Sequence, residues 1–182
     1  PMIHNRNPVF ETVVEKVRTG LKFLFGTRNE VLIFASSGTG AMEGAVTNML
    51  SPGDKAIVVR CGKFGERWAE ICGAYGVVSI NIDLPGGDKL DPSAIAEALE
   101  ANPDAKAVYT QATETSTGTI FPTREIAQIV RNYPGTLMVV DGITGVGVLP
   151  LPMDEWGIDI LIGGSQKALM LPPGLAFAGV SD

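Results

Sequence analysis

Short apolar segments alternate with amphipathic segments along the whole chain, and this alternation constrains the fold more than any other feature. Seven segments are short, apolar and rich in β-branched residues, a pattern that predicts strands. They span residues 31–35, 56–59, 77–82, 107–109, 137–140, 158–162 and 175–180. Helical patterns lie between them, at residues 41–50, 66–75, 92–100 and 124–133. Strands that alternate with helices predict an α/β fold, with parallel strands covered by helices.

Two of the predicted helices carry sequence signals for their first residues. Asp91 precedes Pro92, which is the order expected for an N-cap followed by proline at the first helical position. Thr123 stands before Arg124 and predicts the start of the next helix in the same way. No internal repeat, low-complexity segment or linker interrupts the chain, so one domain is the simplest description.

Composition excludes several classes of function. The net charge is -6 and no run of five basic residues occurs, which argues against nucleic acids and anionic membranes as partners. No apolar stretch approaches the roughly 20 residues that span a bilayer, and the first residues lack the order of a signal peptide. We therefore expect a cytoplasmic protein. Cys61 and Cys72 have no partner motif, so we predict two core thiols rather than a disulfide or a zinc site.

Two residues placed at or just after predicted strand ends suggest the chemistry. Asp141 closes one apolar run, and Lys167 follows the glycine pair 163–164 after the next. Ligands of open α/β sheets bind beyond the carboxyl ends of the strands. A lysine there can form a Schiff base with an aldehyde cofactor, and an aspartate can pair with a protonated ring nitrogen. This pair suggests an enzyme that uses pyridoxal 5'-phosphate.

A glycine-rich segment at residues 35–43 follows a predicted strand and opens a helix. Free N–H groups and the positive end of the helix dipole can bind phosphate there, and Ser37 and Thr39 add hydroxyl donors. The segment fails the dinucleotide pattern, because glycine stands at position 44 rather than 43, and it lacks a P-loop lysine. An ordinary strand-to-helix turn is the alternative.

Several motifs in the same order resemble the class V aminotransferases. Within that class, the chain looks most like the alanine–glyoxylate and serine–pyruvate aminotransferase branch. Near the N-terminus, Asn5 replaces the second histidine of the branch's usual segment. The resemblance implies a fold-type I large domain with a mostly parallel seven-stranded sheet, flanked by helices in three layers. The motifs that carry it are residues 3–10, 37–43, 114–118, 140–141, 164–169 and 172–174.

The resemblance implies a catalytic role for two residues and a packing role for two more. Lys167 would be the Schiff-base lysine and would also move the proton between the substrate α-carbon and the cofactor. Asp141 would hold the ring nitrogen. Ile143 would pack against one face of the ring, and Phe64 would stack on the other, where tryptophan is frequent in this branch.

Four further residues would hold the substituents of the cofactor. By the same resemblance, Thr115 would bond near the phenolic oxygen. Gly38, Thr39 and Gln166 would hold the phosphate, although some members of the family have histidine where Thr39 stands.

Each assignment also has a purely structural interpretation. Lys167 could be an exposed loop residue, and Asp141 could cap the turn before Gly142. Phe64 could be a core aromatic, and Thr115 could bond local backbone groups. The only histidine, His4, is predicted to be structural or to line the substrate entrance, while Trp68 and Trp156 are predicted to be core or interface aromatics.

The predicted function is transfer of an amino group from a small amino acid, alanine or serine, to a keto acid, glyoxylate or pyruvate. The route would be ping-pong. Phosphoserine aminotransferase and cysteine desulfurase are the enzymatic alternatives. Desulfurases usually have histidine before the lysine and need a mobile catalytic cysteine, whereas Gln166 stands here.

We expect residues 1–182 to be a cofactor-binding large domain, truncated at both ends. The family's small C-terminal domain, with the arginine that clamps the substrate carboxylate, would be absent. An inactive truncated domain is therefore an alternative, and a nucleotide-binding oxidoreductase is a third. The resemblance also implies a homodimer for the full-length protein.

Overall fold

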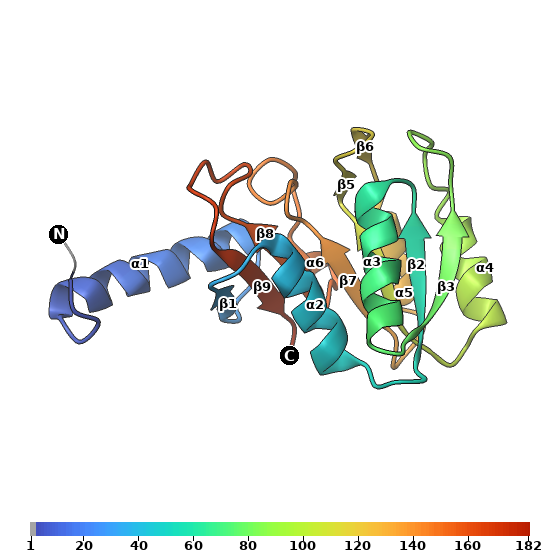
Figure 1. Ribbon diagram of the computed structural model, residues 1–182, viewed down its shortest axis with the longest axis horizontal. Coiled ribbons are helices and arrows are strands. Elements are labelled where there is room, and N and C mark those ends of the chain that lie inside the picture. The colour runs from blue at the N-terminus through green and yellow to red at the C-terminus, as the bar shows by residue number, and fades with distance from the viewer. Residues whose placement is uncertain (1–2) are drawn as a thin grey trace.

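The computed structural model describes residues 3–182. A seven-stranded sheet forms its centre, in the order β1-β9-β8-β7-β4-β2-β3 (Figure 1). The seven predicted strands are all present, which confirms both the strand pattern and the α/β fold class. Their bounds are β1 (Val31–Phe34), β2 (Lys55–Arg60), β3 (Val78–Asp83), β4 (Ala105–Gln111), β7 (Leu137–Asp141), β8 (Ile160–Gly164) and β9 (Ala176–Val180).

The sheet is mostly parallel. Strand β2 runs parallel to β3 and β4, and β7 runs parallel to β4 and β8. Only β9 is reversed, and it pairs antiparallel with both β1 and β8. The connection from β8 to β9, residues 165–175, contains no helix. A parallel return needs a crossover of a dozen or more residues, usually with a helix, so this shorter connection brings the chain back antiparallel.

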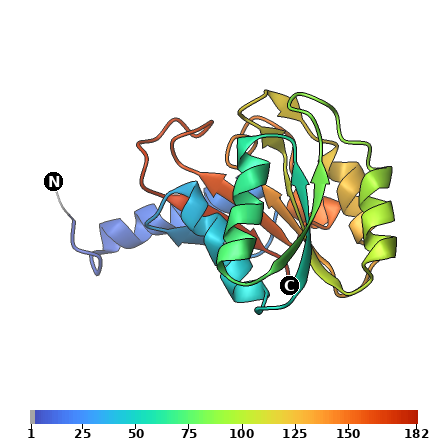
Figure 2. The ribbon, with the colours of Figure 1, turned by 45° about the vertical axis from the view of Figure 1, so that its right-hand side comes forward.

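Helices cover both faces of the sheet and make three layers (Figure 2). On one face lie α2 (Gly38–Met49) and α3 (Lys63–Ala74). The other face is covered by α4 (Ser93–Ala101), α5 (Thr123–Val130), α6 (Met153–Trp156) and the inner end of α1 (Pro8–Phe25). The outer part of α1 extends away from the sheet (Figure 1). None of these helices, in the part of the chain that the structure describes, has the length and apolar character to cross a membrane.

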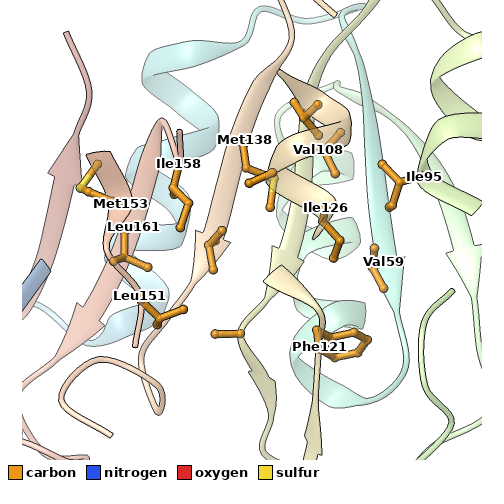
Figure 3. Packing of buried hydrophobic residues seen from close by; sticks show 14 of the residues in the cluster. Val59, Ile95, Val108, Phe121, Ile126, Met138, Leu151, Met153, Ile158 and Leu161 are labelled. Carbon is orange, nitrogen blue, oxygen red and sulfur yellow. The ribbon is translucent and has the colours of Figure 1, made fainter. Parts of the chain in front are cut away.

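Two buried clusters fill the space between the layers. Figure 3 shows the cluster beneath α4 to α6, where Ile126 of α5 and Met153 of α6 join strand residues such as Val108. Beneath α2 and α3, fully buried Trp68 lies 4.5 Å from Tyr109, measured between ring centroids. Each large side chain so buried contributes roughly 1.5–3 kcal/mol.

The predictions for cysteine and tryptophan can be compared with this core. Cys61 and Cys72 are both buried and free, which confirms the prediction of two core thiols. Trp68 is a core residue, and Trp156 is half-buried against the first cluster. His4 lies at the exposed N-terminal end, where its Nδ1 accepts the Arg6 N–H at 3.1 Å.

One long helix was not predicted. Helix α1 has sequence signals at both ends: Asn7 accepts the Val9 N–H at 2.9 Å, Pro8 occupies the first turn, and Gly26 ends the helix with φ 61°. Leu21 and Phe25 are its only fully buried residues. Apolar residues nevertheless recur at helical spacing along it, at Val13, Val17, Leu21 and Phe25, so the sequence did contain a signal for this helix.

The predicted helix starts were partly right. The Asp91 carboxylate accepts the Ser93 N–H at 2.9 Å, although α4 begins at Ser93 rather than at Pro92. The prediction for Thr123 was wrong in detail. Thr123 is the first residue of α5, and its hydroxyl donates to the Phe121 carbonyl instead of accepting an N–H.

The carboxyl ends of the parallel strands meet at one edge of the sheet, the upper edge in Figure 1. A small hairpin of β5 (Thr113–Glu114) and β6 (Thr119–Ile120), which was not predicted, stands above it. The loop after β8 and the turn after β7 lie at the same edge. The fold thereby gathers segments from distant parts of the sequence at this place.

Candidate active site

Asp141 is a buried acidic residue at this edge. It ends β7, is only 5% exposed, and forms no salt bridge within residues 3–182. Its Oδ1 accepts the Ile143 N–H at 2.9 Å, so it does cap the turn after β7. Burial is the main cause that raises the pKa of Asp141, to about 6. The Ile143 hydrogen bond and the positive charges of Lys167 and Arg67 oppose the rise, and the Glu114 charge adds to it. A buried carboxylate without a paired cation can receive a cationic ligand.

Lys167 stands three positions beyond the end of β8 and is exposed. The turn that carries it is closed by a hydrogen bond of 3.0 Å from the Met170 N–H to the Lys167 carbonyl. Its charge acts on Asp141, so the structure brings the two predicted catalytic residues to the same edge. The exposed-loop interpretation describes the side chain correctly, and an accessible amine is also what a Schiff-base lysine requires.

Ile143 links the turn after β7 to two glycines. A Cβ on Gly38, the first residue of α2, would overlap Ile143 Cδ1, and one on Gly164 would lie 3.2 Å from Ile143 Cγ2. Both positions therefore bring backbone close to the Ile143 side chain. Beside them, Gln166 has a buried Oε1 without a partner among the described residues. A half-turn of that amide would present its NH₂ group instead.

Thr39 and Phe64 meet through a residue that the sequence analysis did not assign. The Arg67 Nη1 donates to Thr39 Oγ1 at 3.0 Å. The same guanidinium lies 5.6 Å from the centroid of the Phe64 ring, within the range of a cation–π interaction. Arg67 therefore connects the first turn of α2 to the first turn of α3.

Thr115 lies on the hairpin loop between β5 and β6 and is exposed. Its hydroxyl and that of Thr144 are 3.2 Å apart, and the Thr113 hydroxyl bonds the same Thr144 group. These contacts join the hairpin to the turn after β7. Thr115 therefore bonds another side chain across the site, and Thr144 is a second residue that the sequence analysis missed.

Glu114 is the third missed residue, and it is completely buried. Its Oε2 accepts the N–H groups of Phe64 and Gly65, both at 3.1 Å. Its Oε1 accepts the N–H of Ser116 at 3.1 Å and the Ser116 hydroxyl at 2.6 Å. The N-cap of α3, Gly62, has no side chain to do this, so a carboxylate 50 positions along the chain from Phe64 satisfies the helix start.

The available signal for Glu114 was a charged residue five positions after the predicted strand at residues 107–109. It stood inside one of the motifs that carry the family resemblance. No such signal marked Arg67, because its partner Thr39 is 28 positions away. Only the packing of α3 beside α2 brings those two side chains together.

These residues fit pyridoxal 5'-phosphate. Asp141 offers an unpaired buried carboxylate to a cationic ring nitrogen. The N-terminus of α2 offers N–H groups to a phosphate, and the buried end of the Gln166 amide lacks a partner among the described residues. Lys167 supplies an accessible amine. The arrangement can hold an aromatic, phosphorylated aldehyde and transfer a proton next to it.

A cleft lies elsewhere, on the other side of α3. This cleft has a volume of about 740 Å³ and follows the β2–β3 edge of the sheet. Its charged residues are Arg60, Glu66, Glu70 and Asp83. It contains none of the predicted site residues.

The chain matches curated relatives over all or nearly all of its length. It is 43% identical over 181 residues to the protein named soluble hydrogenase, small subunit, of Synechococcus sp. (strain PCC 6716), covering 98% of this chain and 47% of that protein. It is 38% identical to L-aspartate–glyoxylate aminotransferase of Paracoccus denitrificans, covering 100% of this chain and 47% of that enzyme. The chain thus spans about half the length of the curated relatives it matches.

A solved structure agrees with the fold. Aspartate aminotransferase of subgroup IV from Thermus thermophilus superposes with a TM-score of 0.92 at 35% identity, over 100% of this chain and 51% of that one. This match confirms the predicted fold-type I large domain. The family model described as aminotransferase class-V matches residues 2–182. The chain therefore belongs to the class V aminotransferase family, whose members use pyridoxal 5'-phosphate.

Proposed function

We propose that the intact protein is a pyridoxal-phosphate-dependent aminotransferase that moves an amino group from a small amino acid to a keto acid. Alanine or serine is the proposed donor, and glyoxylate or pyruvate the proposed acceptor. The observation that carries the proposal is the unpaired buried carboxylate of Asp141 at the same end of the sheet as the accessible amine of Lys167, whose charge lowers the Asp141 pKa. The glyoxylate acceptor is also in the name of the Paracoccus relative.

When bound, pyridoxal phosphate supplies an electron sink for the pair of electrons left on the substrate α-carbon after its proton is removed. Asp141 would hold the proton on the ring nitrogen, and its burial keeps water from competing for that contact. Lys167 would anchor the cofactor and, once displaced by the substrate amine, would take the α-proton. An exposed amine on a short turn has the freedom for both tasks.

The remaining residues would orient the cofactor. Ile143 and Phe64 would pack against the ring, and Thr115 would bond its phenolic oxygen together with Thr144. Gly38, Thr39 and Gln166 would hold the phosphate. Glu114 would fix the start of α3 and thereby the position of Phe64.

The rest of the intact protein would complete the site. We propose that residues 1–182 are the large domain, that a small domain supplies an arginine for the substrate carboxylate, and that two copies form a homodimer. The chain covers about half the length of its relatives, which leaves room for such a domain. A cytoplasmic location stays a prediction.

The first test is the visible spectrum of the intact protein mixed with pyridoxal phosphate, before and after borohydride reduction. We expect an absorption band that reduction fixes covalently on Lys167 and that Lys167→Ala lacks. Lys89→Ala, which removes an exposed lysine from a loop outside the site, is the matched control and should keep the band. Absence of the band in the unmutated protein would overturn the proposal.

The second test concerns the substrates. We would measure amino transfer to glyoxylate and to pyruvate from alanine and serine, with aspartate added because it is the donor named for the Paracoccus relative. We expect the highest kcat/KM with alanine or serine. A clear preference for aspartate would overturn the proposed donors and leave the reaction class intact, while cofactor binding without any transfer would support a non-catalytic domain.

A further inference from the structure

We propose that Arg67 is a further cofactor-binding residue, whose guanidinium supplies the positive charge that balances the phosphate group held at Gly38, Thr39 and Gln166. This inference rests on the proposed function. It adds a charged residue to a phosphate site for which the sequence analysis assigned only neutral groups.

The position of Arg67 is the first observation. It lies in α3, three residues after Phe64 and therefore on the same side of the helix. From there it reaches the first turn of α2, where its Nη1 donates to Thr39 Oγ1 at 3.0 Å. The N–H groups of that turn are the ones that a phosphate at a helix N-terminus would contact. The guanidinium therefore stands beside the predicted phosphate position.

Among the described residues Arg67 has no direct ion-pair partner, which is the second observation; it acts on the buried Asp141 carboxylate only as a charge that lowers the Asp141 pKa. Within residues 3–182, no carboxylate lies in salt-bridge contact with it. One turn earlier on the same helix, Lys63 pairs with Glu66 at 3.1 Å and with Glu70 at 3.6 Å. Both acidic residues thus face the lysine and leave the arginine unpaired. A half-buried guanidinium has five N–H donors, and its side-chain bond to Thr39 occupies one nitrogen.

The charge balance of the site favours an anion with more than one negative charge. A phosphate monoester carries about -1.5 to -2 at neutral pH. The N-terminus of α2 offers the equivalent of roughly half a positive charge, and Gly38, Thr39 and Gln166 carry none. In the proposed function, Lys167 forms the Schiff base with the aldehyde and therefore does not bind the phosphate. Arg67 is the remaining cation whose contacts place it at the phosphate position.

The contact with Phe64 explains how the guanidinium is held in place. Its centre lies 5.6 Å from the ring centroid, and such contacts are worth about 0.5–1 kcal/mol at exposed sites. Thr39 on one side and Phe64 on the other restrict the rotamers of Arg67. The residue proposed to stack on the cofactor ring and the residue proposed to balance the phosphate are therefore coupled.

The experiment compares pyridoxal phosphate with pyridoxal, which has the same ring and aldehyde but no phosphate. Equilibrium dissociation constants for both would be measured by absorbance with the intact protein and with Arg67→Met, Arg67→Lys and Lys63→Met. Lys63→Met is the matched control, because it removes one positive charge from the same helix outside the site. The unmutated protein should bind pyridoxal phosphate more tightly than pyridoxal.

We expect Arg67→Met to weaken binding of pyridoxal phosphate by about 10- to 100-fold, the range for losing a hydrogen-bonded charge. Binding of pyridoxal should change by less than about threefold. Arg67→Lys should recover part of the loss, because it keeps the charge but not the fork of donors. Lys63→Met should leave both constants within about twofold.

A second measurement covers the case in which Arg67→Met folds poorly. Inorganic phosphate should raise the melting temperature of the unmutated protein without cofactor, and Arg67→Lys should reduce that rise. The inference would be overturned if substitution of Arg67 weakened both ligands equally, since that pattern indicates a structural role. It would also be overturned if only the KM for the amino acid rose, which would assign Arg67 to the substrate carboxylate. If the unmutated protein bound no pyridoxal phosphate, the proposed function itself would fail.

Discussion

The two sides of helix α3 present opposite arrangements of charge. Toward the candidate site, Phe64 and Arg67 lie near two buried carboxylates, Glu114 and Asp141, and none of the three charged groups has a salt-bridge partner within residues 3–182. Toward the cleft at the β2–β3 edge, the charges are partly exposed and paired. Arg60 bonds Asp83 through two hydrogen bonds of 2.6 and 2.7 Å, and Glu66 and Glu70 pair with Lys63.

The pairing of charges distinguishes the cleft at the β2–β3 edge from the candidate site. The charged side chains that line the cleft of about 740 Å³ all form ion pairs, so none of them needs a ligand as its partner. Exposed ion pairs contribute about 0–1 kcal/mol, whereas burying an unpaired carboxylate costs several times more. Such a cost persists where a ligand or a catalytic role requires it. In this protein, a buried charge without an ion-pair partner is therefore a better indicator of a functional site than the volume of a cleft.

The largest effect is expected for Glu114→Ala. Its carboxylate satisfies the N–H groups of Phe64 and Gly65, and removing it leaves buried donors without partners. We expect a loss of about 4 kcal/mol in the free energy of unfolding, measured by urea denaturation. Glu114→Gln keeps one acceptor oxygen and should lose less than half as much. A loss below about 1 kcal/mol for the alanine variant would show that the buried Glu114 carboxylate contributes no more than an exposed ion pair.

A pH-dependent effect is expected for Asp141→Asn in the protein without cofactor. The folded pKa of Asp141, about 6, lies above its ordinary value of 3.8, so the folded state binds the proton more tightly than the unfolded chain. Wild-type stability contributed by this group is fully present below pH 4 and is lost as the pH rises through about 6.

Asparagine does not ionise, so this loss should vanish in the variant. Relative to wild type, Asp141→Asn should gain about 3 kcal/mol between pH 4 and pH 7, the equivalent of about two pKa units. Urea denaturation at a series of pH values measures the difference. If the stability difference between the two proteins stayed constant with pH, burial would not raise the pKa of Asp141. The same variant should lose cofactor function, which separates stability from activity at this residue.

The smallest effect is expected on the cleft side. Hydrogen bonding with Arg60 lowers the pKa of Asp83, so this pair contributes stability above the ordinary pKa of aspartate and loses it in acid. Because the carboxylate side chain is 63% exposed, solvent screens the pair. Asp83→Asn should therefore change the free energy of unfolding by less than about 1 kcal/mol at pH 7. A change as large as that of Glu114→Ala would break the contrast between the two sides of α3.

The sheet was the most predictable part of the fold. The seven apolar runs correspond to the seven strands, most clearly at the centre of the sheet, where β4, β7 and β8 are almost wholly buried and need continuous apolar side chains. Helix α1 was missed although Val13, Val17 and Leu21 recur at helical spacing and its caps at Asn7 and Gly26 were readable. The β5–β6 hairpin escaped because its strands have two residues each.

Some residues of the candidate site could likewise be predicted from the sequence, and others could not. The roles of Lys167 and Asp141 could be predicted because each follows a strand whose carboxyl end must lie at the ligand-binding edge. Glu114, Thr144 and Arg67 could not be predicted in their contacts. Their partners lie 50, 29 to 31, and 28 positions away, and such pairs depend on how helices and turns pack.

The sequence by itself determined the order of strands and helices, and with it the edge at which a lysine and an aspartate meet. Periodicity and apolar runs are local, so they can be read one segment at a time. The tertiary structure alone decided which charges are balanced. In the folded chain, Glu66 and Glu70 pair with Lys63, and Arg67 donates to Thr39 instead. Glu114 is buried against the start of the same helix. Charge balance depends on distances between segments far apart in the chain, and only the packed fold sets those distances.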